Sequence, residues 1–137
     1  MSSADDGAVA GSLVFGVQTS IVFPGVTLST LADTATATSN TINNRNVGYP
    51  EYMLQINLTG TAAVTAWLDP RILVSIDGGL TYQTYENGFI LPPIILTVAT
   101  IIYTARVLAP EYWRLAIRNV TGAALTAGTA FYQGIRR

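Results

Sequence analysis

Short segments with the period of a β-strand recur along this chain, and no stretch has the period of an amphipathic helix. Residues 51–59 are the clearest case, because Tyr52, Leu54, Ile56 and Leu58 alternate with mostly polar side chains. A two-residue period places alternate side chains on opposite faces of a sheet. Elsewhere Thr, Val, Ile and aromatic residues dominate, whereas strong helix formers such as Glu, Lys and Gln are scarce. The sequence therefore predicts an all-β protein.

The β-patterned segments are short and regularly spaced. Some run into one another through corners, and together they make about ten or eleven strands. They lie at 12–18, 20–23, 26–31, 34–42, 51–59, 62–68, 71–77, 80–86, 94–98, 101–107, 112–119 and 126–133. Turns are predicted at Asp69-Pro70 and at Asp77-Gly78-Gly79, and a turn-rich loop at 40–50. The 34–42 segment, which alternates Thr with Ala, suits an outer or edge strand. This spacing predicts an antiparallel β-sandwich, jelly-roll-like in architecture.

No linker or shift in composition divides the chain of 137 residues, a length that fits one domain. We expect residues 12–137 to form a single β-sandwich domain. Residues 1–11 are rich in small residues and carry Asp5 and Asp6. They are predicted to be a flexible N-terminal arm, which could order by lying on a neighbouring subunit.

The residue types that carry most enzyme chemistry are missing. The chain has no His, no Cys and no Lys, since all seven cationic residues are Arg. It therefore lacks the commonest general base and metal ligand, a thiolate nucleophile, and a lysine for a Schiff base or a P-loop. We expect no enzymatic activity, no cofactor and no metal site.

Pairs of carboxylates are the remaining catalytic possibility, because a glycosidase needs only two. Asp69 with Asp77, or Glu86 with Glu111, could be brought together by a sandwich. Each of these residues, however, stands beside Pro or Gly where turns use polar side chains to bind the backbone. Asp5-Asp6 and the pair Asp69 and Asp77 lack the clustered spacing of the oxygen ligands in a calcium loop. The turn interpretation is therefore favoured over catalysis or calcium binding.

The segment 75–82, Ser-Ile-Asp-Gly-Gly-Leu-Thr-Tyr, resembles the Asp box of sialidase-type propellers. In that family the box is structural. We expect Asp77 to accept backbone N–H groups across a turn, Gly79 to supply a positive φ, and Tyr82 to close the base. The box occurs once here, whereas a propeller repeats it, so a propeller is excluded.

Charge is unusually scarce, at 11% of residues against about 25% in an average domain. A small monomer with so few charges would expose large apolar patches, so the composition indicates an obligate homo-oligomer or a subunit of an assembly. The net charge is −1 and no basic stripe is visible, so no nucleic-acid partner is expected. The longest apolar run, 89–103, is too short for a membrane span and is broken by two prolines. No membrane partner and no export signal are expected.

Three groups of residues are candidates for contacts with other subunits or a capsid. The first is an apolar tongue ahead of two rigid prolines, made of Phe89, Ile90, Leu91, Pro92 and Pro93. The second is arginines, whose planar fork suits interface pairing: Arg106, Arg114, Arg118, Arg136 and Arg137. The third is the acidic pair of the arm, Asp5 and Asp6. Ordinary strand-surface arginines are an equal alternative for the second group.

The aromatic residues could instead form a platform for sugars. Trp67 and Trp113 lie among apolar neighbours in predicted strands, which favours core packing for both. Tyr82 and Tyr85 would fall on opposite faces of a strand at 80–86 and make a poor common platform.

The C-terminal third carries a resemblance to a class of proteins. It reads Ala-Pro-Glu-Tyr-Trp-Arg-Leu-Ala-Ile-Arg-Asn-Val-Thr-Gly over 109–122, then a segment rich in Ala and Thr, then Phe-Tyr-Gln-Gly over 131–134. This resembles the closing hairpin of many tailed-bacteriophage virion proteins, among them jelly-roll decoration (cement) proteins and receptor-binding or baseplate modules. The resemblance implies a β-sandwich packed as a homotrimer on a virion.

The leading hypothesis is a non-enzymatic phage capsid decoration protein. It would be made in the host cytoplasm, reside in the virion, form homotrimers and bind the major capsid protein or other virion proteins. Its trimers would clamp neighbouring capsomers. The alternatives are a carbohydrate-binding tail, receptor-binding or adhesin module, and another virion component of the tail, neck or head fibre.

Overall fold

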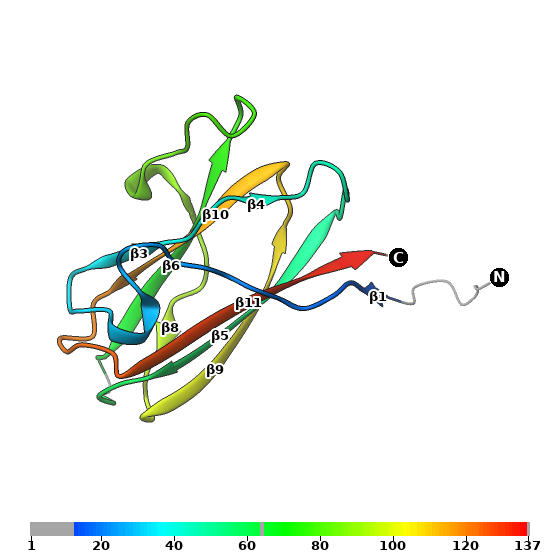
Figure 1. The fold of residues 1–137 in the computed structure, drawn as a ribbon. Coiled ribbons are helices and arrows are strands. Elements are labelled where there is room, and N and C mark those ends of the chain that lie inside the picture. Colours follow the sequence, from blue (N-terminus) through cyan, green and yellow to red (C-terminus); the bar gives the residue numbers. More distant parts are fainter. Residues whose placement is uncertain (1–12, 64, 137) are drawn as a thin grey trace.

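Two antiparallel sheets packed face to face make up the protein (Figure 1). The structure, a computed structural model, describes residues 13–63 and 65–136. The first sheet contains β1 (Val14–Phe15), β2 (Thr19–Ser20), β5 (Glu51–Thr59), β9 (Thr100–Leu108) and β11 (Ala127–Arg136). The second contains β3 (Thr36–Thr38), β4 (Ile42–Asn43), β6 (Trp67–Ser75), β7 (Phe89–Ile90), β8 (Ile94–Ile95) and β10 (Tyr112–Asn119). The predicted all-β sandwich is confirmed.

The strand order is that of a jelly roll. β1 and β2 pair with the same edge of β11, β3 and β4 with one edge of β10, and β7 and β8 with one edge of β6. If each broken pair counts as one strand, the first strand pairs with the last, the second with the one before the last, and so on inward. The chain is thus a long antiparallel hairpin rolled into two sheets, with residues 76–88 at its tip.

The core lies between the sheets and follows the alternation expected from the sequence. Tyr52, Leu54, Ile56 and Leu58 all point inward from β5, which has the predicted bounds 51–59. Opposite them stand buried residues of the second sheet: Leu68, Ile72, Trp113, Leu115 and Ile117. Burying each such side chain stabilises the fold by roughly 1.5–3 kcal/mol, so the core fixes which face of each strand is inside.

An aromatic cluster joins the two sheets through the core. Tyr52 and Tyr132 from the first sheet make an edge-to-face pair with ring centroids 5.3 Å apart. The Trp113 ring from the second sheet lies 5.5 Å from Tyr52 and 6.3 Å from Tyr132. Burial raises the pKa of Tyr52 to about 12, and its hydroxyl donates to Asn44 Oδ1 at 2.8 Å. The prediction that Trp113 belongs to the core is confirmed.

The prediction of a turn at Asp69-Pro70 is wrong, because both residues lie inside β6, opposite Arg118 and Ile117 of β10. The backbone carbonyl of Pro70 accepts from Leu91 N at 3.1 Å. In an antiparallel strand the N and C=O of one residue face the same neighbour, so the missing N–H of Pro70 also faces this edge. There the partner strand is interrupted between β7 and β8, and a proline costs no ladder bond at such a break.

Three further strand predictions are wrong, each in a segment that the structure shows as a loop or a turn. Residues 62, 63, 65, 66 and 80–84 are not in strands, and 26–31 contains a 3₁₀ turn, η1 (Leu28–Thr30), instead of a strand. A second 3₁₀ turn, η2 (Tyr85–Asn87), follows residues 80–84. Trp67 is not in the core: its side chain lies at the end of β6 and the residue is 40% exposed. None of the helical turns in the part of the chain that the structure describes could span a membrane.

Asn119 is a buried polar residue that holds two loops, the one after η1 and the one between β10 and β11, to the end of β10. Its side chain donates to the carbonyl oxygens of Leu31 at 2.9 Å and Ala123 at 2.8 Å, and accepts from Thr121 N at 2.9 Å. The residue is fully buried. Every polar atom of this amide therefore has a partner inside the protein, as buried polar groups require.

Replacing Asn119 by alanine is expected to lower the free energy of unfolding by about 2–4 kcal/mol, because it leaves buried backbone groups without partners. Urea unfolding followed by fluorescence measures this loss. Asn57→Ala is the matched control: Asn57 is partly exposed on β5 and its amide contacts are 3.2 and 3.5 Å long. It should change stability by no more than about 0.5 kcal/mol. Equal losses in the free energy of unfolding for the two variants would contradict the structural role described for Asn119.

Candidate interaction surface

A hollow lies between the two sheets on the side where β9 is the edge strand of the first sheet and β7 is the edge strand of the second. We call it the apolar groove. Its volume is about 560 Å³. The residues that line it are Pro50, Ile72, Val74, Phe89, Leu91, Arg106, Val107, Leu108, Ala109 and Pro110. Arg106 is the one charged residue among them, so the groove offers an almost wholly apolar contact surface.

The predicted apolar tongue lies along one wall of this groove. Phe89 and Ile90 form β7 and pair with Ile72 and Arg71 of β6, so they are held in a strand and do not project as a loop. The side chains of both nevertheless remain largely exposed, with Phe89 at 61%. Two of the five tongue residues, Phe89 and Leu91, line the groove.

The prolines that follow the tongue are also fixed in place. The carbonyl oxygen of Pro92 accepts a hydrogen bond from the Tyr103 hydroxyl of β9 at 2.7 Å, which ties the segment to the first sheet. Pro93 lines a separate hollow of about 350 Å³ together with Thr65, Ala66, Trp67 and Ile95. The half-exposed Trp67 ring therefore borders a concave site, a placement that the sequence did not predict.

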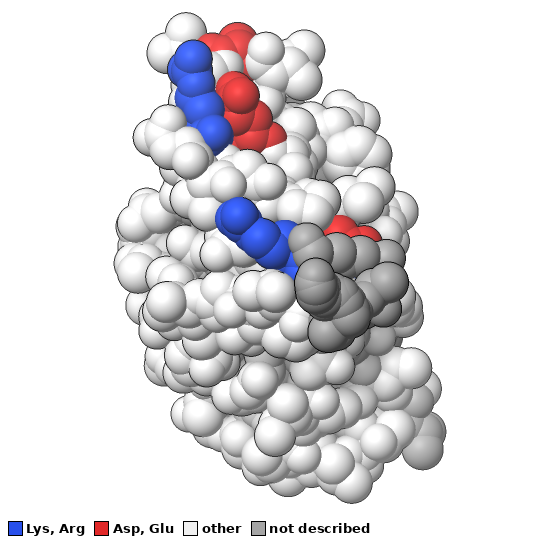
Figure 2. All heavy atoms as spheres, turned by 90° about the vertical axis from the view of Figure 1, so that its right-hand side faces the viewer, with Lys and Arg blue, Asp and Glu red and all other residues white. Residues whose placement is uncertain are grey.

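Leu108 is the most exposed apolar residue on the wall formed by the first sheet. It is 79% exposed and borders both the apolar groove and a third hollow, which is lined by Pro50, Glu51, Leu108, Ile135 and Arg136. Arg106 forms an ion pair with Glu51 of its own chain, so its charge is neutralised locally. Among the described residues, the charged side chains visible from the end at which the C-terminal strand finishes lie in the upper half of the view (Figure 2).

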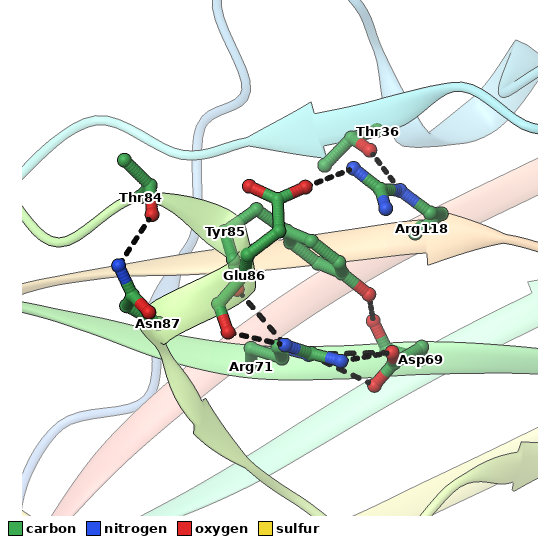
Figure 3. Close-up of polar contacts among 8 residues, drawn as sticks. All are labelled: Thr36, Asp69, Arg71, Thr84, Tyr85, Glu86, Asn87 and Arg118. Atoms are coloured by element: carbon green, nitrogen blue, oxygen red, sulfur yellow. Dashed lines mark hydrogen bonds and ion pairs between the residues drawn. The ribbon is translucent and has the colours of Figure 1, made fainter.

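The four predicted contact arginines that the structure describes have partners in their own chain. Arg118 and Arg71 lie on the two sides of the Tyr85 ring, with guanidinium carbons 4.0 and 4.5 Å from its centroid (Figure 3). Arg118 also donates to Thr36 Oγ1 at 2.9 Å and pairs with Glu86 at 3.5 Å. Such cation–π contacts are each worth roughly 0.5–2 kcal/mol.

Asp69 completes this cluster on the outer face of the second sheet. It forms an ion pair with Arg71 at 3.0 Å, and its backbone carbonyl accepts from the Tyr85 hydroxyl at 2.9 Å. Arg71 donates further to the carbonyl oxygens of Tyr85 and Glu86. Burial raises the pKa of Tyr85, so this phenol stays a neutral donor. The contacts fasten η2 onto the sheet.

Tyr82 is held in the same way, over Arg114 of β10 with a guanidinium carbon 4.1 Å from the ring centroid. Its hydroxyl shares a hydrogen bond of 2.7 Å with Thr41 Oγ1. The prediction that Tyr82 and Tyr85 point to opposite faces is therefore wrong, because both cover arginines of the second sheet. The segment is a loop and a 3₁₀ turn, to which a strand period does not apply.

The remaining predicted contact residues lie near the ends of the chain. Arg136 stacks on Tyr49, 4.4 Å from the ring centroid, and donates to the carbonyl oxygen of Val47 at 3.3 Å. Arg137, Asp5 and Asp6 are outside the described residues. A role of these arginines and aspartates in an interface stays a prediction.

The Asp-box segment forms the hairpin-like loop that the sequence predicted. Asp77 Oδ1 accepts the backbone N–H groups of Leu80 at 3.1 Å and Thr81 at 2.9 Å, and the hydroxyls of Ser75 and Thr81 also donate to its carboxylate. Gly79 has the expected positive φ of 91°. The Thr81 hydroxyl and N–H, then Ser75 and Leu80, lower the pKa of Asp77 to about 2.

Two apolar side chains stand at the tip of this loop. Ile76 is 98% exposed and Leu80 is 83% exposed. The loop projects beyond the ends of the sheets (Figure 1). The sequence analysis did not predict either residue. The Asp-box pattern was nevertheless a signal for them, because the side chains of Ser75, Asp77 and Thr81 bond to one another inside the loop and the apolar residues between them then face outward. The tip is a second exposed apolar element, and the hydrogen bonds to Asp77 hold its loop in place.

Three of the four carboxylates considered for catalysis make structural contacts through their side chains, and Glu111 contributes its backbone carbonyl, which accepts from Asn44 N at 2.8 Å. Asp69 pairs with Arg71, Asp77 binds its own loop, and Glu86 pairs with Arg118. Among residues 13–63 and 65–136, no group of three or more Asp or Glu is placed to hold a metal ion. The distinctive features of the surface are thus the apolar groove and the apolar loop tip.

Comparison with known proteins leaves the functional argument to the structure. The sequence matches no protein-family model, and a search of curated proteins gives no significant match.

The lowered pKa of Asp77 predicts a defined acid sensitivity. Because the folded-state pKa of about 2 lies below the ordinary value of 3.8, the ionised carboxylate stabilises the loop above pH 3.8, and this contribution is lost as the pH falls through about 2. The melting temperature of the wild type should therefore approach that of Asp77→Asn between about pH 4 and 2. An NMR titration of the Asp77 carboxyl carbon should give a midpoint near 2. A midpoint near 3.8 would contradict the described bonding.

Proposed function

We propose that this protein is a non-enzymatic structural subunit of a virion, a decoration protein that forms trimers and clamps neighbouring capsomers. The observation that carries the proposal is the apolar groove with its exposed rim of Phe89, Ile90 and Leu108. Exposed apolar surface of this kind marks a protein–protein interface on a soluble domain.

The mechanism we propose is the burial of preformed apolar surface. Each square ångström of apolar area removed from water contributes about 25 cal/mol, and the gain is kept only when little freedom is lost on binding. The groove wall is fixed by the pairing of β7 with β6, and the loop tip by the bonds to Asp77. Both elements are therefore ordered before they meet a partner.

The fold is compatible with this role but does not decide it, since jelly rolls serve in viral capsids and in lectins. The resemblance of residues 109–122 and 131–134 to the closing hairpin of virion proteins favours the first. In this structure those residues form most of β10 and the later part of β11.

The proposal is tested by native mass spectrometry and by cosedimentation with undecorated phage capsids, chosen by sequencing the genes that lie next to the gene of this protein. The wild type should be trimeric and should bind. Leu108→Asp is expected to reduce capsid binding or trimer formation by at least about tenfold, because it places a charge in an apolar contact. Val17→Asp is the matched control: Val17 is 85% exposed and does not line the groove. A monomer that ignores capsids, or equal losses in both variants, would contradict the proposal.

The exposed Trp67 favours a second candidate, a carbohydrate-binding tail or adhesin module. Its ring borders a hollow with Pro93 and Ile95, and sugars stack on such aromatic faces. If this candidate were correct, the protein would bind glycans on an array and Trp67→Ala would abolish the binding. If the protein is instead a decoration protein, neither the wild type nor Trp67→Ala should bind glycans.

A further inference from the structure

The four sheet edges of the sandwich differ greatly in length. One edge of the first sheet is broken into β1 and β2, and the edges of the second sheet are broken into β3 with β4 and β7 with β8. None of these six pieces is longer than three residues. The fourth edge is β9, which runs unbroken through nine residues, from Thr100 to Leu108. Natural sandwiches shorten or interrupt an edge that must not pair, so β9 is the exception here.

The backbone groups at this edge can be assigned. Gly60 N donates to the carbonyl of Ala99, and Ala109 N donates to that of Pro50, so residues 99 and 109 are hydrogen-bonded to the neighbouring strand. Along a strand of an antiparallel pair, the backbone N–H and C=O groups of successive residues point alternately toward the partner strand and away from it. Residues 101, 103, 105 and 107 therefore face β5, whereas Thr100, Ile102, Thr104, Arg106 and Leu108 turn their N–H and C=O away from it. Within the described chain these outward groups have no backbone partner.

One two-fold register satisfies the whole edge. If Thr104 lies opposite Thr104 of a second copy, Ile102 lies opposite Arg106, and Thr100 opposite Leu108. All five residues are outward-facing, so every outward N–H and C=O in each strand finds a partner. A two-fold axis through any other residue of β9 leaves some of these groups unpaired at one end.

The side chains fit the same register. The Thr104 hydroxyls face each other, as in stabilising cross-strand threonine pairs. The only charge on β9, Arg106, is paired with Glu51 on β5, the side away from the free edge, and it meets the apolar Ile102 of the other copy. No like charges are brought together, and the exposed Ile102 and Leu108 are partly covered.

We propose that β9 is a self-pairing edge, by which two copies of this chain join antiparallel about Thr104 into one continuous sheet. The occupant is a second copy because the edge complements itself throughout its length. This inference does not depend on the proposed function. If the protein also forms trimers, the two-fold contact links one trimer to the next, and the combination of two-fold and three-fold contacts builds a shell-like network.

Single cysteines test the register, since the full chain has none of its own. In Thr104→Cys the two Cα atoms would be about 5.5 Å apart, within the range of a disulfide. Thr100→Cys is the matched control, an exposed threonine on the same strand and face. The two-fold register would place its Cα atoms about 26 Å apart. Under mild oxidation, Thr104→Cys should give disulfide-linked dimers at least about tenfold faster than Thr100→Cys, following the thiol proximity.

A charge variant tests the contact without cross-linking. Thr104→Lys places two ammonium groups opposite each other and should weaken self-association of the full chain, measured by sedimentation velocity, about fivefold or more. Circular dichroism verifies that the variant is folded. Equal cross-linking rates for the two cysteine variants, or self-association unchanged in Thr104→Lys, would overturn the proposal.

Discussion

A two-sheet sandwich cannot pair the backbone groups at its own edges, and this constraint shapes most of the surface described here. Three of the four edges are broken into pieces of two or three residues. The fourth, β9, is continuous, and beside it the sheets part to form the apolar groove. The unpaired backbone and the exposed apolar side chains at the rim of the groove therefore occur on the same side of the molecule, and together they suit assembly better than catalysis.

The outer face of the second sheet, unlike the β9 side, is covered by the chain itself. Residues 82–87 cover it, through Tyr82 and Tyr85 stacked on Arg114, Arg118 and Arg71. The chain thus uses three of its seven arginines and two tyrosines to cover one face internally. The same loop holds Ile76 and Leu80 outward at its tip. The few charged residues first indicated an assembly. In the structure, three of the arginines contact tyrosines of their own chain.

The strands with strong alternation were predictable from the sequence. Residues 51–59 and 112–119 have the predicted bounds, because a buried face imposes a two-residue period wherever a strand crosses the core. Local rules failed where a distant contact decides the conformation. Pro70 is accommodated in β6 only because β7 and β8 leave a break opposite it, and residues 80–84 leave the strand conformation as the Asp77 and arginine contacts hold the loop.

The candidate surface was predictable only in part. The apolar tongue was visible as a run of large side chains, but its wall partners Leu108 and Pro50 come from other parts of the chain and depend on the jelly-roll order.

Residue-resolved amide exchange over a range of protein concentrations tests the central claim, that β9 is an assembly edge, most directly. The account predicts that the amides of Ile102, Thr104 and Arg106 become protected as the concentration rises, while those of Tyr103 and Ala105 are protected throughout. Rapid exchange at Ile102, Thr104 and Arg106 at every concentration would contradict it.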